Sequence, residues 1–153
     1  MLNPDYIVGF VDGEGCFCIT INKNGNRLPE VRLIFEIEMR EDDEPILRNI
    51  QERLGCGNIY RLEYERYRKW RPHVKYKVSN FSDISNRIIP FFRQYPLQAK
   101  KRLDFDKFCQ VAGIIEAKGH LTKQGIERVR ALRHGDSLDA LDAHVQWGAT
   151  EIT

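Results

Sequence analysis

The chain has 153 residues, a length that fits one domain with its own hydrophobic core. Its 42% hydrophobic and 30% charged residues are those of an ordinary globular domain, without a membrane span, internal repeat or low-complexity tract. The formal net charge of +2 is too small to indicate a nucleic-acid partner, so the positions of the charges carry the information. Seven Lys/Arg and five aromatic residues lie between Gly57 and Lys77 against two acids, whereas acids gather in residues 41–44.

Cysteine and histidine spacing gives no sign of a metal site. The cysteines are Cys16, Cys18, Cys56 and Cys109. They contain no CxxC pair, and the histidines lack metal-ligand spacing, so we expect no zinc site but free, mostly buried thiols in a reducing compartment. The first periodic segment begins by Asp5, which leaves no room for a transit peptide. The sequence predicts a soluble intracellular protein, in a prokaryotic cytoplasm or an organelle, with no membrane contact.

The first forty residues predict a helix followed by a β-hairpin. Asn3-Pro4 is typical of a helix cap and first turn, and Gly13 and Gly15 should end this helix. Strands are expected over residues 16–22 and 31–40, joined by an Asn-Gly-Asn turn. The second strand alternates cleanly between apolar and polar side chains, so one of its faces should pack and the other should face solvent.

The remaining sequence predicts a helix, two strands and then only helices. Asp42 or Asp43 should cap the helix that Gly55 ends, and Ser82 should cap a later helix that Pro90 kinks or ends. The other expected limits are strands 57–65 and 73–80, joined by a basic connection, and helices 98–116 and 122–132. This order is typical of an α+β fold in which antiparallel strands carry helices on one face. We expect one domain over residues 1–135 and a tail, residues 136–153, that forms a short helix or frays.

The stretch from Tyr6 to Gly15, YIVGFVDGEG, is hard to explain as an ordinary surface helix. Gly9 and Gly13 lie on one helical face, where they remove side-chain bulk and let another helix approach closely. Each costs the helix about 1 kcal/mol relative to alanine, which indicates a packing role. Asp12 and Glu14 lie at the C-terminal end, where the helix dipole disfavours carboxylates unless a cation such as Mg²⁺ neutralises them.

This stretch resembles the LAGLIDADG motif position by position, with Glu14 where the family alternates Asp and Glu as its second acid. Residues 54–57 (LGCG), 88–105 (IIPFFRQYPL followed by KKRLDF) and 120–125 (HLTKQG) resemble the same family. The resemblance covers the chain from Tyr6 to about Leu132. It implies an αββαββα fold with a saddle-shaped antiparallel sheet. Because the chain has one motif and half the length of two-motif members, it also implies a homodimer.

The resemblance further implies a homing endonuclease, which cuts both strands of a long, near-palindromic DNA site and leaves short 3′ overhangs. Glu14 would ligate Mg²⁺ (or Mn²⁺), with the Gly13 carbonyl as a second ligand, in two-metal phosphodiester hydrolysis. Asp12 is expected to close the end of the helix rather than to bind metal. The dimer interface is expected at Tyr6, Gly9, Phe10 and Gly13.

Basic residues should assist the reaction beside the phosphate. Lys100 is our first choice for this role and Lys101 our second. The family often places a polar residue at the end of the second strand, where this sequence has Met39 or Arg40. Arg40 is the better candidate because a guanidinium can hold a phosphate.

The open face of the sheet should lie along the major groove of DNA and contact base edges. Strand alternation selects as base readers Cys18, Thr20, Asn22, Arg32, Glu36, Glu38, Asn58, Tyr60, Lys75 and Lys77. The residues that better suit phosphate contacts are Arg61, Arg66, Arg68, Lys69 and Arg71.

Three alternatives stay open. An intron-RNA maturase would keep the fold after losing cleavage, and loss of the motif acid would indicate it, but Glu14 is present. A DNA-binding regulator on the same scaffold usually carries a helix-turn-helix domain, for which the tail after Gly135 is too short. An interaction module without nucleic acid is disfavoured by the basic and aromatic residues between Gly57 and Lys77.

Overall fold

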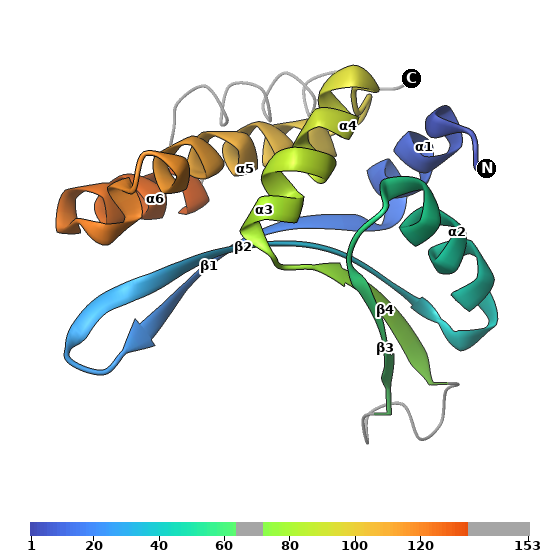
Figure 1. Cartoon of the computed structure of the whole chain (residues 1–153), viewed down its shortest axis with the longest axis horizontal. Coiled ribbons are helices and arrows are strands. Elements are labelled where there is room, and N and C mark those ends of the chain that lie inside the picture. Colours follow the sequence, from blue (N-terminus) through green and yellow to red (C-terminus); the bar gives the residue numbers. More distant parts are fainter. Residues whose placement is uncertain (64–71, 135–153) are drawn as a thin grey trace, which may run out of the picture.

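The structure, a computed structural model, describes residues 1–63 and 72–134 of the chain. Within them, a four-stranded antiparallel sheet carries the helices on one face and leaves its other face open, as the sequence predicts (Figure 1). No helix of this described part is long and apolar enough to cross a membrane. The predictions that lie outside the described residues are those for Arg66, Arg68, Lys69, Arg71 and the tail, 136–153.

Two hairpins form the sheet. The strands are β1 (Gly15–Asn24), β2 (Arg27–Arg40), β3 (Asn58–Leu62) and β4 (His73–Val78). Their order in space is β1-β2-β4-β3, so β2 and β4 form the centre. β2 begins at Arg27 rather than Val31 because the hairpin turn is tight and is formed by Gly25, whose φ of +59° glycine adopts without strain.

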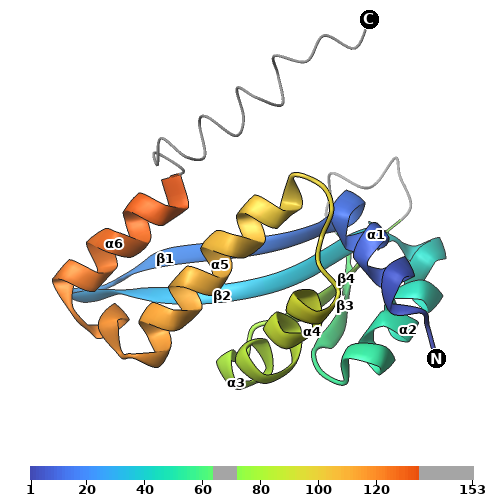
Figure 2. The same cartoon turned by 90° about the horizontal axis from the view of Figure 1, so that it is seen from above.

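The helices pack on the same face of this sheet. They are α1 (Pro4–Glu14), η1 (Glu41–Asp43), α2 (Glu44–Leu54), α3 (Phe81–Asp83), the π-helical η3 (Ile84–Ile88), α4 (Ile89–Gln94), α5 (Lys101–Glu116), η4 (Gly119–Leu121) and α6 (Lys123–His134). In the view from above, α5 and α6 lie over the β1–β2 hairpin, and α1 and α2 lie towards the other end of the sheet (Figure 2). α5 therefore begins beside the end of α1, with which it is in contact.

Several local expectations are wrong. Gly13 lies inside α1, which continues to Glu14. Asn80 rather than Ser82 caps α3, because its side chain accepts a hydrogen bond from the backbone N–H of Asp83 at 3.1 Å. Pro90 does not end its helix, and the π-helical segment η3 directly before it accommodates a proline that cannot donate a backbone hydrogen bond.

The ends of α2 and the beginning of α5 can also be compared with the predicted limits. Asp43 occupies the cap before α2 without a side-chain hydrogen bond to the helix, so the expected capping contact is absent there. Gly55 ends α2 in the left-handed conformation, with φ +73°, as predicted. α5 begins at Lys101 rather than Gln98, because a side chain of α1 binds the backbone of the preceding turn.

An aromatic cluster joins the sheet to the helices. The ring of Phe17, on β1, lies 5.1 Å from that of Phe35 on β2 and 5.5 Å from that of Phe92 on α4. It also lies 5.2 Å and 5.3 Å from the rings of Phe105 and Phe108 on α5. Each such pair contributes about 0.5–1.5 kcal/mol beyond simple burial. The strand that follows α1 is thus anchored firmly at its beginning.

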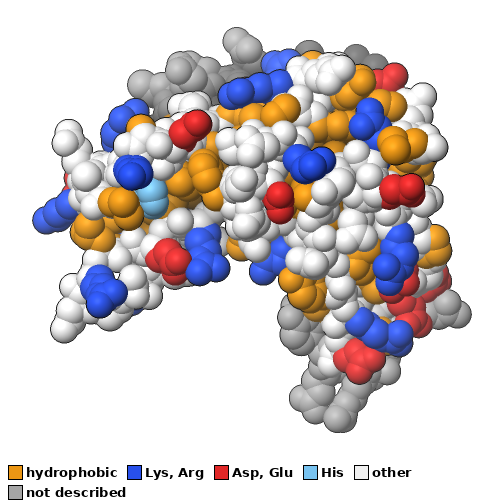
Figure 3. Space-filling model, viewed as in Figure 1, with side chains coloured by type: hydrophobic (Ala, Val, Ile, Leu, Met, Phe, Trp, Pro, Cys, Tyr) orange, Lys and Arg blue, Asp and Glu red, His pale blue; other side chains and the backbone are white. Residues whose placement is uncertain are grey.

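The open face of the sheet is concave. The β1–β2 hairpin and the β3–β4 hairpin both bend away from the helices, at opposite ends of the sheet (Figure 1). In the space-filling view the molecule is hollowed beneath the sheet, and Lys and Arg side chains lie on both sides of the hollow (Figure 3). We call this surface the concave sheet face; it is the face opposite the hydrophobic core.

Candidate active site and nucleic-acid interface

One side of α1 packs on the core and the other is bare. Ile7, Val8 and Val11 are buried. Gly9 and Gly13 are exposed, and a Cβ atom added to either would meet no other atom within 4 Å. The residues of the bare side, which we call the glycine face, are Tyr6, Gly9, Phe10 and Gly13. Tyr6 is 51% exposed, and its ring stacks on that of Phe10, which is half-buried against the hydrophobic core. Within the described residues, Tyr6, Gly9 and Gly13 are therefore the bare part of this side.

Asp12 has a structural role that differs from the one expected. Its carboxylate accepts hydrogen bonds from the backbone N–H groups of Gln98, at 2.9 Å, and Ala99, at 3.2 Å. It therefore does not close its own helix but holds the turn that precedes α5. This contact fixes the start of α5 against the end of α1, and with it the two lysines that begin that helix.

Glu14 is the last residue of α1 and is exposed. No hydrogen bond or ion pair engages its carboxylate among residues 1–63 and 72–134, and the last turn of the helix contains no basic residue. β1 begins directly after Glu14, and the close turn requires glycine at position 15. A Cβ atom on Gly15 would lie 2.6 Å from Cγ1 of Val11, too close for any other residue. Glu14 is thus an uncompensated anion at the negative end of a helix, at the point where α1 meets the concave sheet face.

Lys101 and Lys100 differ in their surroundings. Lys101, the first residue of α5, is half-buried, and its charge is among the causes that lower the pKa of Cys16. Cys16 is two residues beyond Glu14, so the Lys101 ammonium lies near the beginning of β1. Lys100 is exposed ahead of the helix. This placement favours Lys101, our second choice, over Lys100.

Arg40 and Met39 are separated by strand alternation. Met39 packs against the hydrophobic core, whereas Arg40 is exposed at the end of β2 and is paired in register with His73 on β4. Arg40 is therefore the residue of this pair that can reach a phosphate from the concave sheet face.

The structure places the predicted base readers together on the concave sheet face. They alternate along each strand with buried or half-buried apolar residues, and none of them is buried itself. In the register of the sheet, Glu36 and Glu38 lie opposite Lys77 and Lys75, and Lys75 in turn lies opposite Tyr60. One continuous surface thus contains both hydrogen-bond donors and acceptors at strand spacing.

Ion pairs link the central residues of this surface. The Lys75 ammonium lies 3.5 Å from Glu36 and 3.8 Å from Glu38. Glu38 also lies 3.2 Å from Nδ1 of His73, a concave-face residue that the sequence analysis missed. The alternation His73, Lys75, Lys77 would have identified it. The charges of this face are therefore largely compensated within the protein.

Arg61 points away from the concave sheet face. It is one residue out of phase with Tyr60 and forms ion pairs with Glu41 at 3.0 Å and Glu63 at 2.9 Å. The pairs are exposed, so their energetic contribution is small and they leave the guanidinium available for exchange. A phosphate contact at the edge of the sheet fits this position better than a base contact.

The thiols of β1 differ from the buried thiols that we expected. Cys16 is exposed, and Cys18, Cys56 and Cys109 are half-buried. Cys16 and Cys18 share the concave sheet face, and their Sγ atoms lie 2.6 Å apart. The hydrogen bond from Cys18, aided by Lys101, lowers the pKa of Cys16 to about 7 against the opposing effect of burial. The same hydrogen bond, together with burial, raises the pKa of Cys18.

Comparisons with known proteins show the family to which this chain belongs. The family model described as LAGLIDADG endonuclease matches residues 7–112. The chain belongs to the LAGLIDADG endonuclease family. A curated relative, probable intron-encoded endonuclease 2 of Neurospora crassa, is 33% identical over 141 residues, which are 90% of this chain and 29% of the relative. Probable intron-encoded endonuclease 3 of the same organism is 30% identical over 132 residues, 86% of this chain and 24% of the relative.

Solved structures share the fold. I-SmaMI bound to uncleaved DNA target in the presence of calcium ions matches with a TM-score of 0.79 and 34% identity, over 88% of this chain and 44% of that one. The homing endonuclease I-TnaI matches with a TM-score of 0.77 and 30% identity, over 86% of each chain. This chain therefore spans less than half of I-SmaMI and less than a third of these two curated relatives.

Proposed function

We propose that this chain is a site-specific DNA endonuclease that acts as a homodimer and requires a divalent metal ion. The observation that carries the proposal is the exposed Glu14 carboxylate, which no side chain of the described residues engages and which lies where the glycine face meets the concave sheet face. A carboxylate in that position can hold a cation against a DNA phosphate. The relatives support the reaction class, since they are named as endonucleases and I-SmaMI is bound to DNA in its solved structure.

The glycine face supports the dimer. Two copies of α1 that meet at Gly9 and Gly13 around a two-fold axis would cover the exposed ring of Tyr6 and the outer part of the half-buried Phe10 ring. The same contact would bring the two Glu14 carboxylates together, one for each DNA strand. The size of I-SmaMI agrees with this arrangement, because one copy of this chain matches only 44% of it.

The residues at the end of α1 fit Mg²⁺ or Mn²⁺. A hard divalent ion of this kind is held in proteins by one or two carboxylates, with water and substrate phosphates completing its shell. Each protomer supplies Glu14 and the Gly13 carbonyl, a set too small for a closed site in a single chain but suited to one shared between protomers and DNA. When bound, the ion supplies an activated water and stabilises the leaving 3′ oxygen. Calcium, another hard divalent ion, is present in the complex of I-SmaMI with its uncleaved DNA target.

The basic side chains act on the phosphate. Asp12 positions α5 through Gln98 and Ala99, and Lys101 at the start of that helix stabilises the charge that develops during cleavage. Arg40 binds a phosphate from the end of β2. Two cuts placed across the minor groove leave short 3′ overhangs, which is the outcome that the family resemblance implies.

The concave sheet face supplies sequence recognition. Lys75, Lys77 and Arg32 suit guanine, Asn58 suits adenine, and Glu36 or Glu38 accepts a hydrogen bond from cytosine. Because the dimer presents this face twice, the site should be long and near-palindromic. The names of the curated relatives support an origin in an intron, and we place the protein in the organelle or cell that carries it.

Incubation with a library of DNA sites tests the proposal. With Mg²⁺ present, sequencing of the cut ends should yield one preferred near-palindromic site with short 3′ overhangs. With a chelator present, binding should persist and cutting should stop. Binding to a preferred site without cleavage in Mg²⁺ would instead favour the maturase or the DNA-binding regulator.

A further inference from the structure

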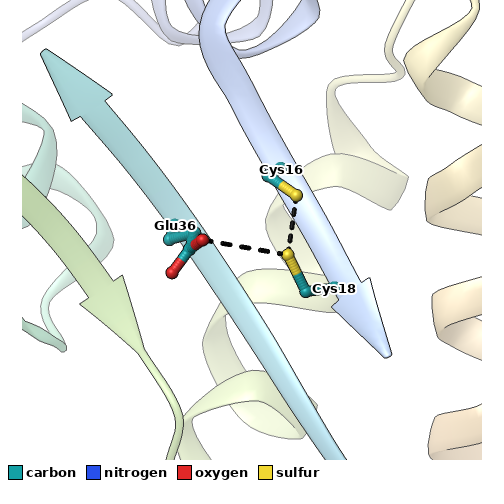
Figure 4. Close-up of side chains that lie close together, drawn as sticks. All are labelled: Cys16, Cys18 and Glu36. Carbon is teal, nitrogen blue, oxygen red and sulfur yellow. Dashed lines mark hydrogen bonds between the residues drawn. The ribbon is translucent and has the colours of Figure 1, made fainter. Parts of the chain in front are cut away.

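The concave sheet face brings two thiols and a carboxylate together near the end of α1. Cys16 and Cys18 are two residues apart on β1 and so share a face, and Glu36 on β2 lies directly opposite Cys16 in the register. One ligand atom from each, two Sγ atoms and a carboxylate oxygen, lie within 4.8 Å of one another (Figure 4). Within residues 1–63 and 72–134, this is the one group of three His, Cys, Asp or Glu side chains at such a spacing.

We propose that Cys16, Cys18 and Glu36 form a site for a thiophilic divalent ion, Zn²⁺ by preference. Two thiolates select a borderline or soft ion over Mg²⁺, whose shell is made of oxygen ligands. Cysteine sulfur and carboxylate oxygen are both common zinc ligands. Because zinc usually binds four ligands in a tetrahedron, these three residues leave the fourth position for water. The site is distinct from the oxygen-ligand site proposed at Glu14, although both lie near the junction of α1 and β1.

The distances require one small adjustment. Ligand bonds of about 2.3 Å to sulfur and about 2.1 Å to oxygen put tetrahedral S and O ligands about 3.6 Å apart. Sγ of Cys18 lies 3.9 Å from Oε1 of Glu36, close to that value. The two Sγ atoms lie 2.6 Å apart and must separate to about 3.8 Å around a zinc ion. Cys16 is exposed, so a rotation of its side chain achieves this without disturbing the core.

Neighbouring charges orient the carboxylate and limit the affinity. Oε2 of Glu36 faces the Lys75 ammonium at 3.5 Å, while Oε1 faces Cys18, so Lys75 acts as an outer-shell partner that aims one oxygen at the thiols. Lys101 places a second positive charge near Cys16. These two cations oppose an added ion, but they are fewer than the three anionic ligands. The site is therefore open, accessible and moderate in affinity rather than a closed structural zinc site.

A cobalt titration of the free protein tests the proposal without DNA. Co²⁺ replaces Zn²⁺ in thiolate sites and gives a thiolate-to-metal charge-transfer absorption. In a Cys56→Ser/Cys109→Ser background, kept reduced by a phosphine, we expect one Co²⁺ per chain, displaced by Zn²⁺ and unaffected by excess Mg²⁺. Cys18→Ser and Glu36→Gln should each weaken binding at least about tenfold. Absence of the absorption, or unchanged binding in both variants, would overturn the site.

A second measurement uses the unaltered sequence, in case the double serine background fails to fold. Zn²⁺ should protect Cys16 and Cys18 from alkylation, read by mass spectrometry, and leave Cys56 and Cys109 unprotected. Equal protection of all four thiols would refute the proposal. Glu14→Gln is the matched control: zinc binding should be unchanged in it, and loss of zinc would assign the ion to the end of α1 instead. Because no arm measures cleavage, the outcome is independent of the proposed function.

Discussion

The glycine face and the concave sheet face are both exposed, yet they differ in whether their side chains already have partners within the protein. The glycine face combines bare backbone, the exposed ring of Tyr6 and the half-buried ring of Phe10. At its end lies the Glu14 carboxylate, which no residue among 1–63 and 72–134 engages. On the concave sheet face, by contrast, Lys75 bridges Glu36 and Glu38, and His73 binds Glu38. On the glycine face, a binding partner would make new contacts without breaking existing ones. On the concave sheet face, a binding partner would replace ion pairs that already exist.

Because of this difference, dimerisation through the glycine face and DNA binding by the concave sheet face should have different free-energy costs. A partner helix on the glycine face gains apolar burial without breaking a contact in the protein. DNA on the concave sheet face must displace exposed or half-exposed ion pairs, each worth about 0–1 kcal/mol, before a base edge can bind. Dimerisation should therefore be strong and non-selective, whereas DNA recognition should be selective because a mismatched base leaves a displaced charge unpaired.

The largest effect is expected from Glu14→Gln. The change keeps the size of the side chain and removes the charge, so cleavage in Mg²⁺ should fall by more than about 10³-fold, since losing even one transition-state hydrogen-bond donor costs about 10²–10³. Affinity for DNA should persist or rise, because an anion that faces phosphate has been removed. Single-turnover cleavage and equilibrium binding measure the two quantities separately.

The control for Glu14 is Glu116→Gln, which alters an exposed acid at the far end of α5. It should leave both quantities unchanged. A heterodimer with one Glu14→Gln subunit should nick one strand or stall. Full cleavage by the homodimeric Glu14→Gln variant would remove the carboxylate from the mechanism.

Gly9→Leu should weaken dimerisation through the glycine face. A leucine has room in the isolated chain, because nothing lies within 4 Å of an added Cβ, so the protomer should fold normally. In the dimer it would force the two helices apart at an overpacking cost of about 1–3 kcal/mol, which weakens association about 5- to 150-fold. Sedimentation equilibrium measures this change.

Gly113→Leu is the matched control for Gly9, since Gly113 is also an exposed helical glycine with open space around it. Both changes raise helix propensity equally, so only their positions differ. Dimerisation that survives in Gly9→Leu as well as in Gly113→Leu would place the interface elsewhere.

Asp12→Ala tests whether the two carboxylates at the end of α1 differ in role. Asp12 has hydrogen-bond partners and should stabilise the fold, whereas Glu14 has none among the described residues. The change removes two charge-assisted hydrogen bonds to Gln98 and Ala99 from a half-buried carboxylate, and should lower the free energy of unfolding by about 1–2 kcal/mol. Urea denaturation measures this loss, with Asp106→Ala, an exposed acid of α5, as the control. An unchanged midpoint would mean that the turn before α5 does not depend on Asp12.

Sequence patterns predicted what depends on local periodicity. The alternation along β2 assigned Arg32, Glu36 and Glu38 to the open face, as the structure has them. The motif made Glu14 the metal-ligand candidate, which stays a prediction. What failed depends on contacts between distant residues. Asp12 binds a turn 86 residues away, and Glu36 reaches Cys18 only through the register of β1 and β2. Local spacing cannot show such a pairing, so the sequence alone did not bring Cys18 and Glu36 together.

The most local effect, confined to one position of the DNA site, is expected from Lys75→Ala, which tests the concave sheet face. Under the proposed function this half-buried ammonium contacts a base edge, so its loss should cost about 1–3 kcal/mol at one position of the DNA site and relax the preference there. The change also leaves Glu36 and Glu38 without their shared cation, which adds repulsion towards DNA on every sequence. Binding to a set of sites that differ at single positions separates these two contributions, and Arg48→Ala, an exposed arginine on α2, is the control. A loss that is equal on all sites would reassign Lys75 from base recognition to charge compensation, and the concave sheet face would then differ from the glycine face in charge alone.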